Sequence, residues 1–139
     1  MINKFIEAWN KNKSDLEDYF KTHCQSEYDS YGSLVKLIFD IVINPELEGY
    51  YGSTYDTNNM YCIDDGDYRG TQIFLLHKTR YQPDETDYVF THTYYGSCSG
   101  CDTLLAISDY RDGLPDNEQV ADYMSLCLHL VEKCKYLGG

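Results

Sequence analysis

Residues 71–107 read TQIFLLHKTRYQPDETDYVFTHTYYGSCSGCDTLLAI, and the expected architecture can be built outward from them. The stretch holds two strand-like runs, at 71–78 and 87–95, and Pro83 between them cannot continue a strand interior. A third run, at 60–64, precedes them across the turn-forming segment DDGDYRG. Consecutive short strands joined by turns predict an antiparallel meander.

Helical patterns lie on both sides of these strands. The polar NKNKS stretch is expected to bend or break the N-terminal helix, because Ser14 and Glu17 form the signature of a new capping box. Pro45 is expected to stop the apolar helix before the strands, and Asp102 to cap the helix after them. Apolar residues recur at helical spacing over 2–9, 14–20, 34–43, 103–110 and 116–137.

Together these elements predict an α+β fold, with a small antiparallel sheet of three or more strands packed with N-terminal helices and a long C-terminal helix. The 139 residues, 42% of them hydrophobic, suit a single domain over 1–139 with a substantial core. The residues expected to be buried are Leu34, Ile38, Ile41, Val42, Ile73, Leu75, Leu104, Val120, Met124, Cys127 and Val131.

The composition is strongly acidic, with 23 Asp and Glu against 11 Lys and Arg and a formal net charge of -12. This charge repels phosphate backbones and anionic lipids, so it disfavours direct binding to nucleic acid or membranes and favours a protein partner with a basic surface. The N-terminus lacks the pattern of a secretory signal, and no apolar run approaches the roughly 18 residues of a membrane span. We therefore expect a cytoplasmic protein.

The cysteines are expected to be thiols without structural disulfides, as is usual in a reducing cytoplasm. Cys98 and Cys101 form a C-x-x-C pair, but structural zinc needs four ligands. If Cys127 and Cys134 share one helix, they cannot both complete the site. Seven helical residues span about 10.5 Å, whereas two sulfurs on one zinc lie at most about 4.6 Å apart. Their place on an apolar stripe favours burial instead. Ligands that remain open for a mixed zinc site are Cys62, His92 and His129.

Two further chemistries are considered for the loop GSCSGCDT, residues 96–103. The dipole of the following helix would favour the thiolate of Cys101, as in redox sites, but thioredoxin-type pairs belong to a βαβ context and not to a meander. The glycines can cradle an anion, but the lysine of a phosphate-binding loop is missing and Asp102 adds negative charge. The favoured interpretation is a structural corner between strand and helix, with both cysteines reduced.

Fifteen tyrosines are many for this length, and several stand beside acidic turns. Tyrosine provides contact area at small entropic cost, although it also suits strand surfaces for purely structural reasons. No convincing catalytic set is present, so we expect a non-enzymatic protein. The candidate binding residues are Tyr94, Tyr95, Cys98, Cys101, Asp102, Asp64, Asp65 and Asp67. Zinc held by Cys98 and Cys101 is the alternative.

Two motifs within residues 61–108, IDDGDYRGTQIFLL and YYGSCSGCDTLLAI, resemble a group of small proteins encoded by phages and prophages of low-GC Gram-positive bacteria. The resemblance covers about a third of the chain and brings no activity or cofactor with it. It implies an accessory protein in the cytoplasm of a bacterial host. By analogy, the acidic composition suggests an anti-defence inhibitor that mimics DNA and binds a host enzyme. A small-ligand or zinc-binding module centred on CSGC is the alternative function.

Overall fold

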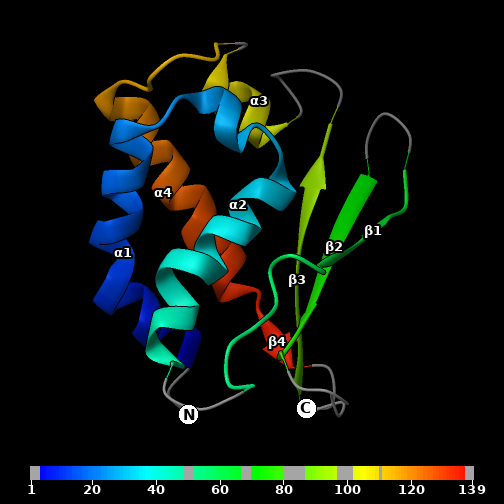
Figure 1. Ribbon diagram of the computed structural model, residues 1–139. Coiled ribbons are helices and arrows are strands. Elements are labelled where there is room, and N and C mark those ends of the chain that lie inside the picture. Colours follow the sequence, from blue (N-terminus) through cyan, green and yellow to red (C-terminus); the bar gives the residue numbers. More distant parts are fainter. Residues whose placement is uncertain are drawn as a thin grey trace.

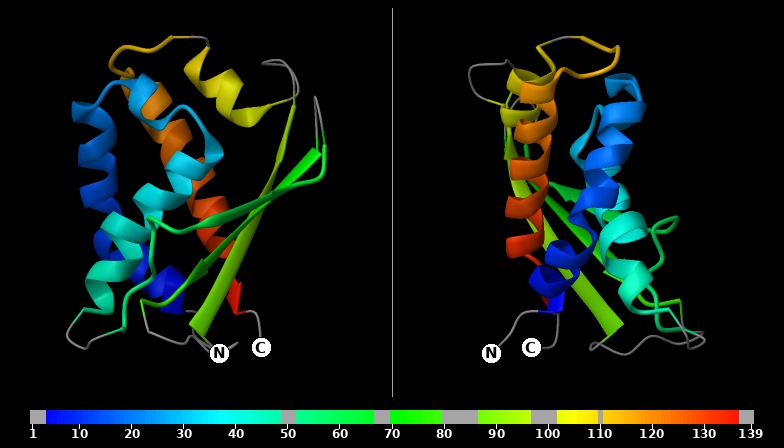
Figure 2. Two further views of the ribbon diagram at one scale, coloured as in Figure 1. Left: turned by 45° about the vertical axis from the view of Figure 1, so that its right-hand side comes forward. Right: turned by 90° about the vertical axis from the view of Figure 1, so that its left-hand side faces the viewer.

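The computed structural model shows two layers, with helices packed on one face of a four-stranded antiparallel sheet (Figures 1 and 2). It describes residues 4–48, 52–66, 70–79, 87–96, 102–109 and 111–136. The helical segments are α1 (Lys4–Thr22), η1 (Gln25–Tyr28), α2 (Tyr31–Leu37), η2 (Ile38–Ile43), η3 (Asn44–Glu46), α3 (Thr103–Ser108) and α4 (Asn117–Glu132). The strands are β1 (Tyr61–Asp64), β2 (Gly70–His77), β3 (Tyr88–Tyr95) and β4 (Lys135–Tyr136).

The sheet confirms the predicted α+β fold and the meander, and it adds one strand. Its order is β1-β2-β3-β4, with antiparallel neighbours throughout. The last helix was expected to reach residue 137, but α4 ends at Glu132 and the chain then extends along β3, where Val89 pairs with Tyr136. Without β4, the backbone N–H and C=O groups along this edge of β3 would lack strand partners. Residues that continued α4 could not bond to them, because their own backbone groups would bond within the helix. Pairing with β3 is therefore what ends α4 early.

The N-terminal helix is continuous, so the break predicted at NKNKS is wrong, as is the capping box at Ser14. The polar stretch contains no proline or glycine, and its residues remain compatible with a helix. Tertiary contacts also hold it in place. The Asn12 amide donates to the Val42 carbonyl at 2.9 Å and to Glu46 at 3.0 Å, and Lys11 pairs with Glu46 at 3.0 Å. These polar residues thus fasten α1 to η2 and η3.

The face of β2 that packs on the helices is the opposite of the one predicted. Phe74 and Leu76 are buried, whereas Ile73 and Leu75, which were expected in the core, are only partly buried and point away from the helices. All four consecutive residues are apolar, so hydrophobicity alone did not distinguish the two faces. The contact with α4 decides it, because the buried Thr91 opposite Phe74 donates to the Leu130 carbonyl at 2.6 Å.

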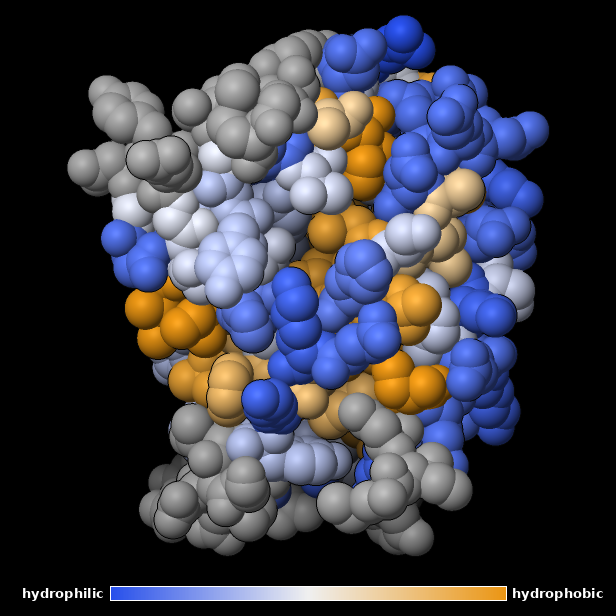
Figure 3. Space-filling model, turned by 180° about the vertical axis from the view of Figure 1, so that it is seen from behind, coloured by the Kyte–Doolittle hydropathy of each residue, from blue (hydrophilic) through white to orange (hydrophobic). Residues whose placement is uncertain are grey.

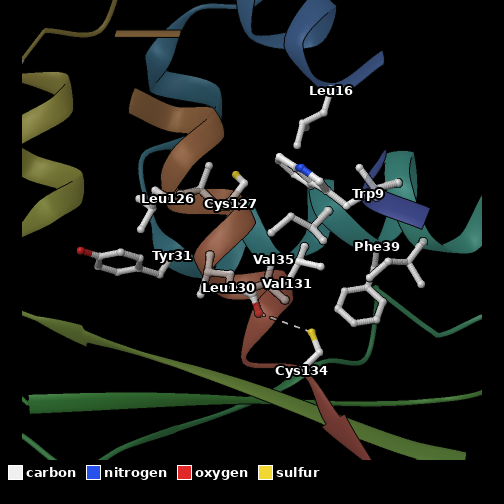
Figure 4. Close-up of a cluster of buried hydrophobic side chains, with 14 of the residues drawn as sticks. Trp9, Leu16, Tyr31, Val35, Phe39, Leu126, Cys127, Leu130, Val131 and Cys134 are labelled. Carbon is white, nitrogen blue, oxygen red and sulfur yellow. Dashed lines mark hydrogen bonds between the residues drawn. The ribbon is translucent and has the colours of Figure 1, made fainter. Parts of the chain in front are cut away.

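The buried side chains form one continuous cluster between α1, α2, η2, α4 and the sheet (Figure 4). Most of the predicted core residues belong to it, but Ile41 and Met124 are only partly buried at its edge. Within the described part of the chain, every buried side-chain nitrogen and oxygen has a hydrogen-bond partner. No helix formed by the described residues is long and apolar enough to cross a membrane.

Cys127 and Cys134 are both buried free thiols, as expected, but only Cys127 lies on α4. Cys134 follows the end of the helix, and its thiol donates to the Leu130 carbonyl (Figure 4) at 3.5 Å. The argument from seven helical residues therefore does not apply to this pair. Burial raises the pKa of Cys134 to about 12 and raises the pKa of Cys127 as well. By contrast, Cys24 and Cys62 are exposed.

Alkylation should separate these two classes of thiol. With iodoacetamide at about pH 8, near the ordinary thiol pKa, we expect the folded protein to be modified at Cys24 and Cys62. Cys127 and Cys134 should be protected until denaturant is added, because only an accessible thiolate reacts. Peptide mass spectrometry of the native and unfolded protein measures the pattern. Modification of Cys127 in the native state as fast as that of Cys24 would contradict the structure.

Candidate functional site

Tyr94 and Tyr95, two of the candidate binding residues, lie on opposite faces of the sheet. Tyr94 pairs with Thr71 and points away from the helices, where 69% of its surface is exposed. Tyr95 is on the helix side of the sheet. Its hydroxyl lies within hydrogen-bond distance of two acceptors, the Asp64 carboxylate and the Gly66 carbonyl, the latter at 2.7 Å. Tyr95 therefore supports the β1–β2 connection, whereas Tyr94 is available for contact.

The acidic residues after β1 are engaged with the backbone around that connection. Asp65 accepts from the Thr71 amide at 2.6 Å, and a side chain on Gly70 would place its Cβ 2.6 Å from the same carboxylate. Asp64 accepts from the Gly66 amide at 3.0 Å. Hydrogen bonds from Tyr95 first, and then from Gly66, lower the pKa of Asp64. Asp64 is thus charged, and hydrogen bonds hold both carboxylates in position at one end of the sheet.

Asp102 is a buried anchor between two distant parts of the chain. Its Oδ1 accepts from the Tyr31 hydroxyl at 2.7 Å and from the Leu105 amide at 3.2 Å, which confirms it as the cap of α3. Its Oδ2 accepts from the Gly96 amide at 2.9 Å. The Tyr31 hydroxyl in turn accepts from the Leu104 amide at 3.1 Å. One carboxylate therefore joins the end of β3, the start of α3 and the start of α2.

The remaining predicted site residues, Cys98, Cys101 and Asp67, lie outside the described residues. Zinc binding at Cys98 and Cys101 consequently stays a prediction. Among the residues that the structure does describe, no group of three or more His, Cys, Asp or Glu side chains is arranged to hold a metal ion. The proposed mixed ligands Cys62 and His92 are on opposite faces of the sheet, since Cys62 pairs with Phe74 and His92 with Ile73.

The feature that sequence reasoning missed is the face of the sheet that points away from the helices. Directly paired residues project to the same side of a sheet and successive residues to opposite sides, so the register assigns every second side chain of β1, β2 and β3 to this face. No described helix or strand covers it (Figure 2). The space-filling view from behind shows hydrophobic atoms at the lower left edge and in the middle of the molecule, among hydrophilic atoms on both sides (Figure 3). We call the following apolar and aromatic residues the open face: Tyr61, Ile63, Ile73, Leu75, Tyr88, Phe90 and Tyr94.

Two histidines sit among these residues and pack near the tyrosines of the open face. The His77 ring lies 5.7 Å from Tyr88 and 6.5 Å from Tyr61, and the His92 ring lies 6.1 Å from Tyr94. Partial burial, followed by the charges of Lys133 and Lys135, lowers the pKa of His92, so its imidazole is neutral at neutral pH. The surface is therefore aromatic and apolar at its centre.

The sequence did carry a signal for this face. In a sheet with one covered side, apolar residues alternate with polar ones. The run Ile73–Leu76 is apolar at every position, and Ile63, Phe90 and Tyr94 continue the second apolar side on neighbouring strands. The sequence therefore provides two apolar sheet faces but only enough helix to cover one of them. This combination indicates that the other face is exposed for contact.

No protein-family model, no curated protein and no solved structure matches this chain.

Proposed function

We propose that this protein is a non-enzymatic binding module that docks a basic protein on the open face of its sheet. The observation that carries the proposal is the apolar and aromatic character of that face together with its exposure. Tyr61, Ile63 and Tyr94 are 57%, 55% and 69% exposed. Monomeric proteins rarely leave contiguous apolar surface in water without a binding role, and tyrosine is enriched where proteins meet.

Charge selects the class of partner. The chain carries a formal net charge of -12, so two copies repel each other and a nucleic acid is repelled as well. A protein with a basic surface is attracted instead, and Asp64 and Asp65 add acidic groups at the end of β1, although the Asp64 side chain lies on the helix side of the sheet. Apolar contact then supplies affinity at the centre, while the acidic residues steer the encounter.

The phage resemblance of residues 61–108 supports a particular kind of basic partner. Host enzymes that handle nucleic acid, including defence nucleases, carry basic surfaces for their own substrates. An acidic protein that occupies such a surface excludes the nucleic acid. We therefore propose a phage accessory protein that inhibits or modulates a host enzyme in the bacterial cytoplasm.

The test is affinity capture from a lysate of a Gram-positive host with three baits: the wild-type chain, an Ile63→Ser/Tyr94→Ser variant and a Leu114→Ser variant. Leu114 is the matched control, because it is also an exposed apolar residue, at 60%, but lies before α4 and away from the sheet. We expect the wild type and the control to retain the same basic protein. The double variant should retain at least about tenfold less of it, as expected when central contact residues are lost.

Capture should also be sensitive to salt, since raising the ionic strength from about 0.1 M to about 1 M shortens the Debye length from about 10 Å to about 3 Å. The affinity of the purified partner, measured by calorimetry, must follow the same pattern: similar for the wild type and the control, and weaker for the double variant. Equal retention by all three baits would overturn the proposal. So would sedimentation velocity that shows a wild-type dimer and a monomeric double variant, because a second copy would then occupy the open face.

A further inference from the structure

A cavity of about 360 Å³ lies at one end of the interface between helices and sheet. The first turns of α1 form one wall, Glu46 and Leu47 form a second, and Tyr136 of β4 a third. Tyr136 pairs with the buried Val89, so the cavity is on the helix side of the sheet, opposite the open face. Its volume is within the range of about 300–1,000 Å³ that is typical of small-molecule sites.

The inner surface of the cavity is apolar and aromatic. Phe5 and Tyr55 are 5% and 3% exposed, and the Phe5 ring lies 5.5 Å from that of Tyr136. Ala8 and Ile43 complete the buried surface. Because Ala8 projects only a methyl group, the space between α1 and Tyr136 is left for the flat or extended apolar part of a ligand.

The rim is rich in lysine, although the chain as a whole is acidic. Three of the 11 lysines and arginines line this one cavity: Lys4, Lys11 and Lys78. Lys11 is paired with Glu46 at 3.0 Å. Neither Lys4 nor Lys78 has an ion-pair partner among the described residues, and the Lys78 ammonium lies 5.8 Å from the centre of the Tyr55 ring. Two lysines therefore line an apolar cavity without an ion-pair partner in the part of the chain that the structure describes.

We propose that this cavity binds a small amphipathic carboxylate, with the carboxylate between Lys4 and Lys78 and its apolar body against Phe5, Tyr55 and Tyr136. A cation close to an aromatic ring and to a ligand carboxylate stabilises both contacts. The site is independent of the proposed docking surface, since the two lie on opposite faces of the sheet.

The acidic residues of the rim limit the charge of the ligand. Glu7 and Glu46 also line the cavity, and Glu46 remains charged because hydrogen bonds from Asn12 and Lys11 lower its pKa. A second negative group on the ligand would therefore approach one of these carboxylates. This selects a monoanion with an aryl or acyl chain over a nucleotide or another polyanion.

The experiment compares 3-phenylpropionate and octanoate with their neutral amides by calorimetric and NMR titration of the full chain. We expect each carboxylate to bind one site, at least about tenfold tighter than its amide. Lys4→Gln/Lys78→Gln should weaken carboxylate binding by about tenfold or more, as is typical of lost charge-assisted hydrogen bonds. Lys21→Gln is the matched control, since Lys21 is on α1 but pairs with Glu17 away from the cavity, and should leave affinity unchanged.

A third variant, Ala8→Leu, tests the apolar part by filling the cavity, and it should reduce binding of both carboxylates. The lysine variants are at the surface and keep the test valid even if Ala8→Leu destabilises the fold. The proposal is overturned if neither carboxylate saturates a site at up to about 10 mM, a concentration well above the dissociation constant expected for ligands of this size. It is equally overturned if carboxylate and amide bind alike, or if inorganic phosphate binds as well as the carboxylates.

Discussion

Replacing Phe20 with alanine is expected to lower the free energy of unfolding by about 3 to 5 kcal/mol, the cost of a large cavity in a packed core. Phe20 is fully buried at the point where α1, η1 and α4 meet. Its ring lies 4.9 Å from Tyr28, edge to face, and stacks 5.2 Å from Tyr123.

The two tyrosines are held by hydrogen bonds that prevent them from moving into the cavity. The Tyr28 hydroxyl donates to the His23 carbonyl at 2.9 Å, and the Tyr123 hydroxyl donates to the buried Gln25 amide oxygen at 2.7 Å. Collapse of the rings into the space left by the substitution would break these bonds, and unpaired buried polar groups cost about 1 to 3 kcal/mol each. The cavity should therefore remain, and the destabilisation should be near the upper end of the range.

Urea unfolding followed by circular dichroism measures this effect, and the melting temperature should fall by about 10 to 20 °C. Leu114→Ala is the control. Its side chain is exposed, so the free energy of unfolding should change by less than about 0.5 kcal/mol. A loss below about 1 kcal/mol for the Phe20 variant, against the range expected for a buried aromatic ring, would contradict the packing described for the three rings.

Replacing Asp102 with alanine is expected to cost about 2 to 4 kcal/mol, which combines the loss of a helix cap with the loss of a buried acceptor. The substitution leaves the Tyr31 hydroxyl and the Gly96 amide without the carboxylate that now accepts from both. It also frees the end of β3 from the start of α3. The hydrogen bond between Asp102 and Gly96 holds together the two ends of the segment 97–101, so this variant tests the structural role of the corner.

Two related variants show whether the loss comes from the predicted contacts. Asp102→Asn keeps one oxygen to accept from Tyr31 and Leu105 and should retain part of the stability. Combining Asp102→Ala with Tyr31→Phe should cost less than the sum of the single changes, with a coupling energy of about 0.5 to 3 kcal/mol. Strict additivity of the two changes, measured by urea unfolding, would show that the hydrogen bond between them contributes nothing.

Local sequence patterns correctly predicted those elements that are specified by residues close to them in the chain. The three strands β1, β2 and β3 occupy the predicted runs, and Asp102 caps α3 as expected, because turn residues and caps act on the chain next to them. The apolar stripe correctly placed Val120, Cys127 and Val131 in the core. These features depend on hydrogen bonds and side-chain directions that are local in sequence.

Composition and local patterns therefore specify an acidic α+β chain with an antiparallel meander, whereas the remaining features depend on tertiary contacts. Which side of Ile73–Leu76 faces the helices depends on contacts with α4, and the end of α4 depends on pairing with β3. The open face and the lysine-rimmed cavity each combine residues from separate elements. Such sites arise from packing between segments far apart in the chain, and spacing along the sequence carries no information about how those segments approach one another.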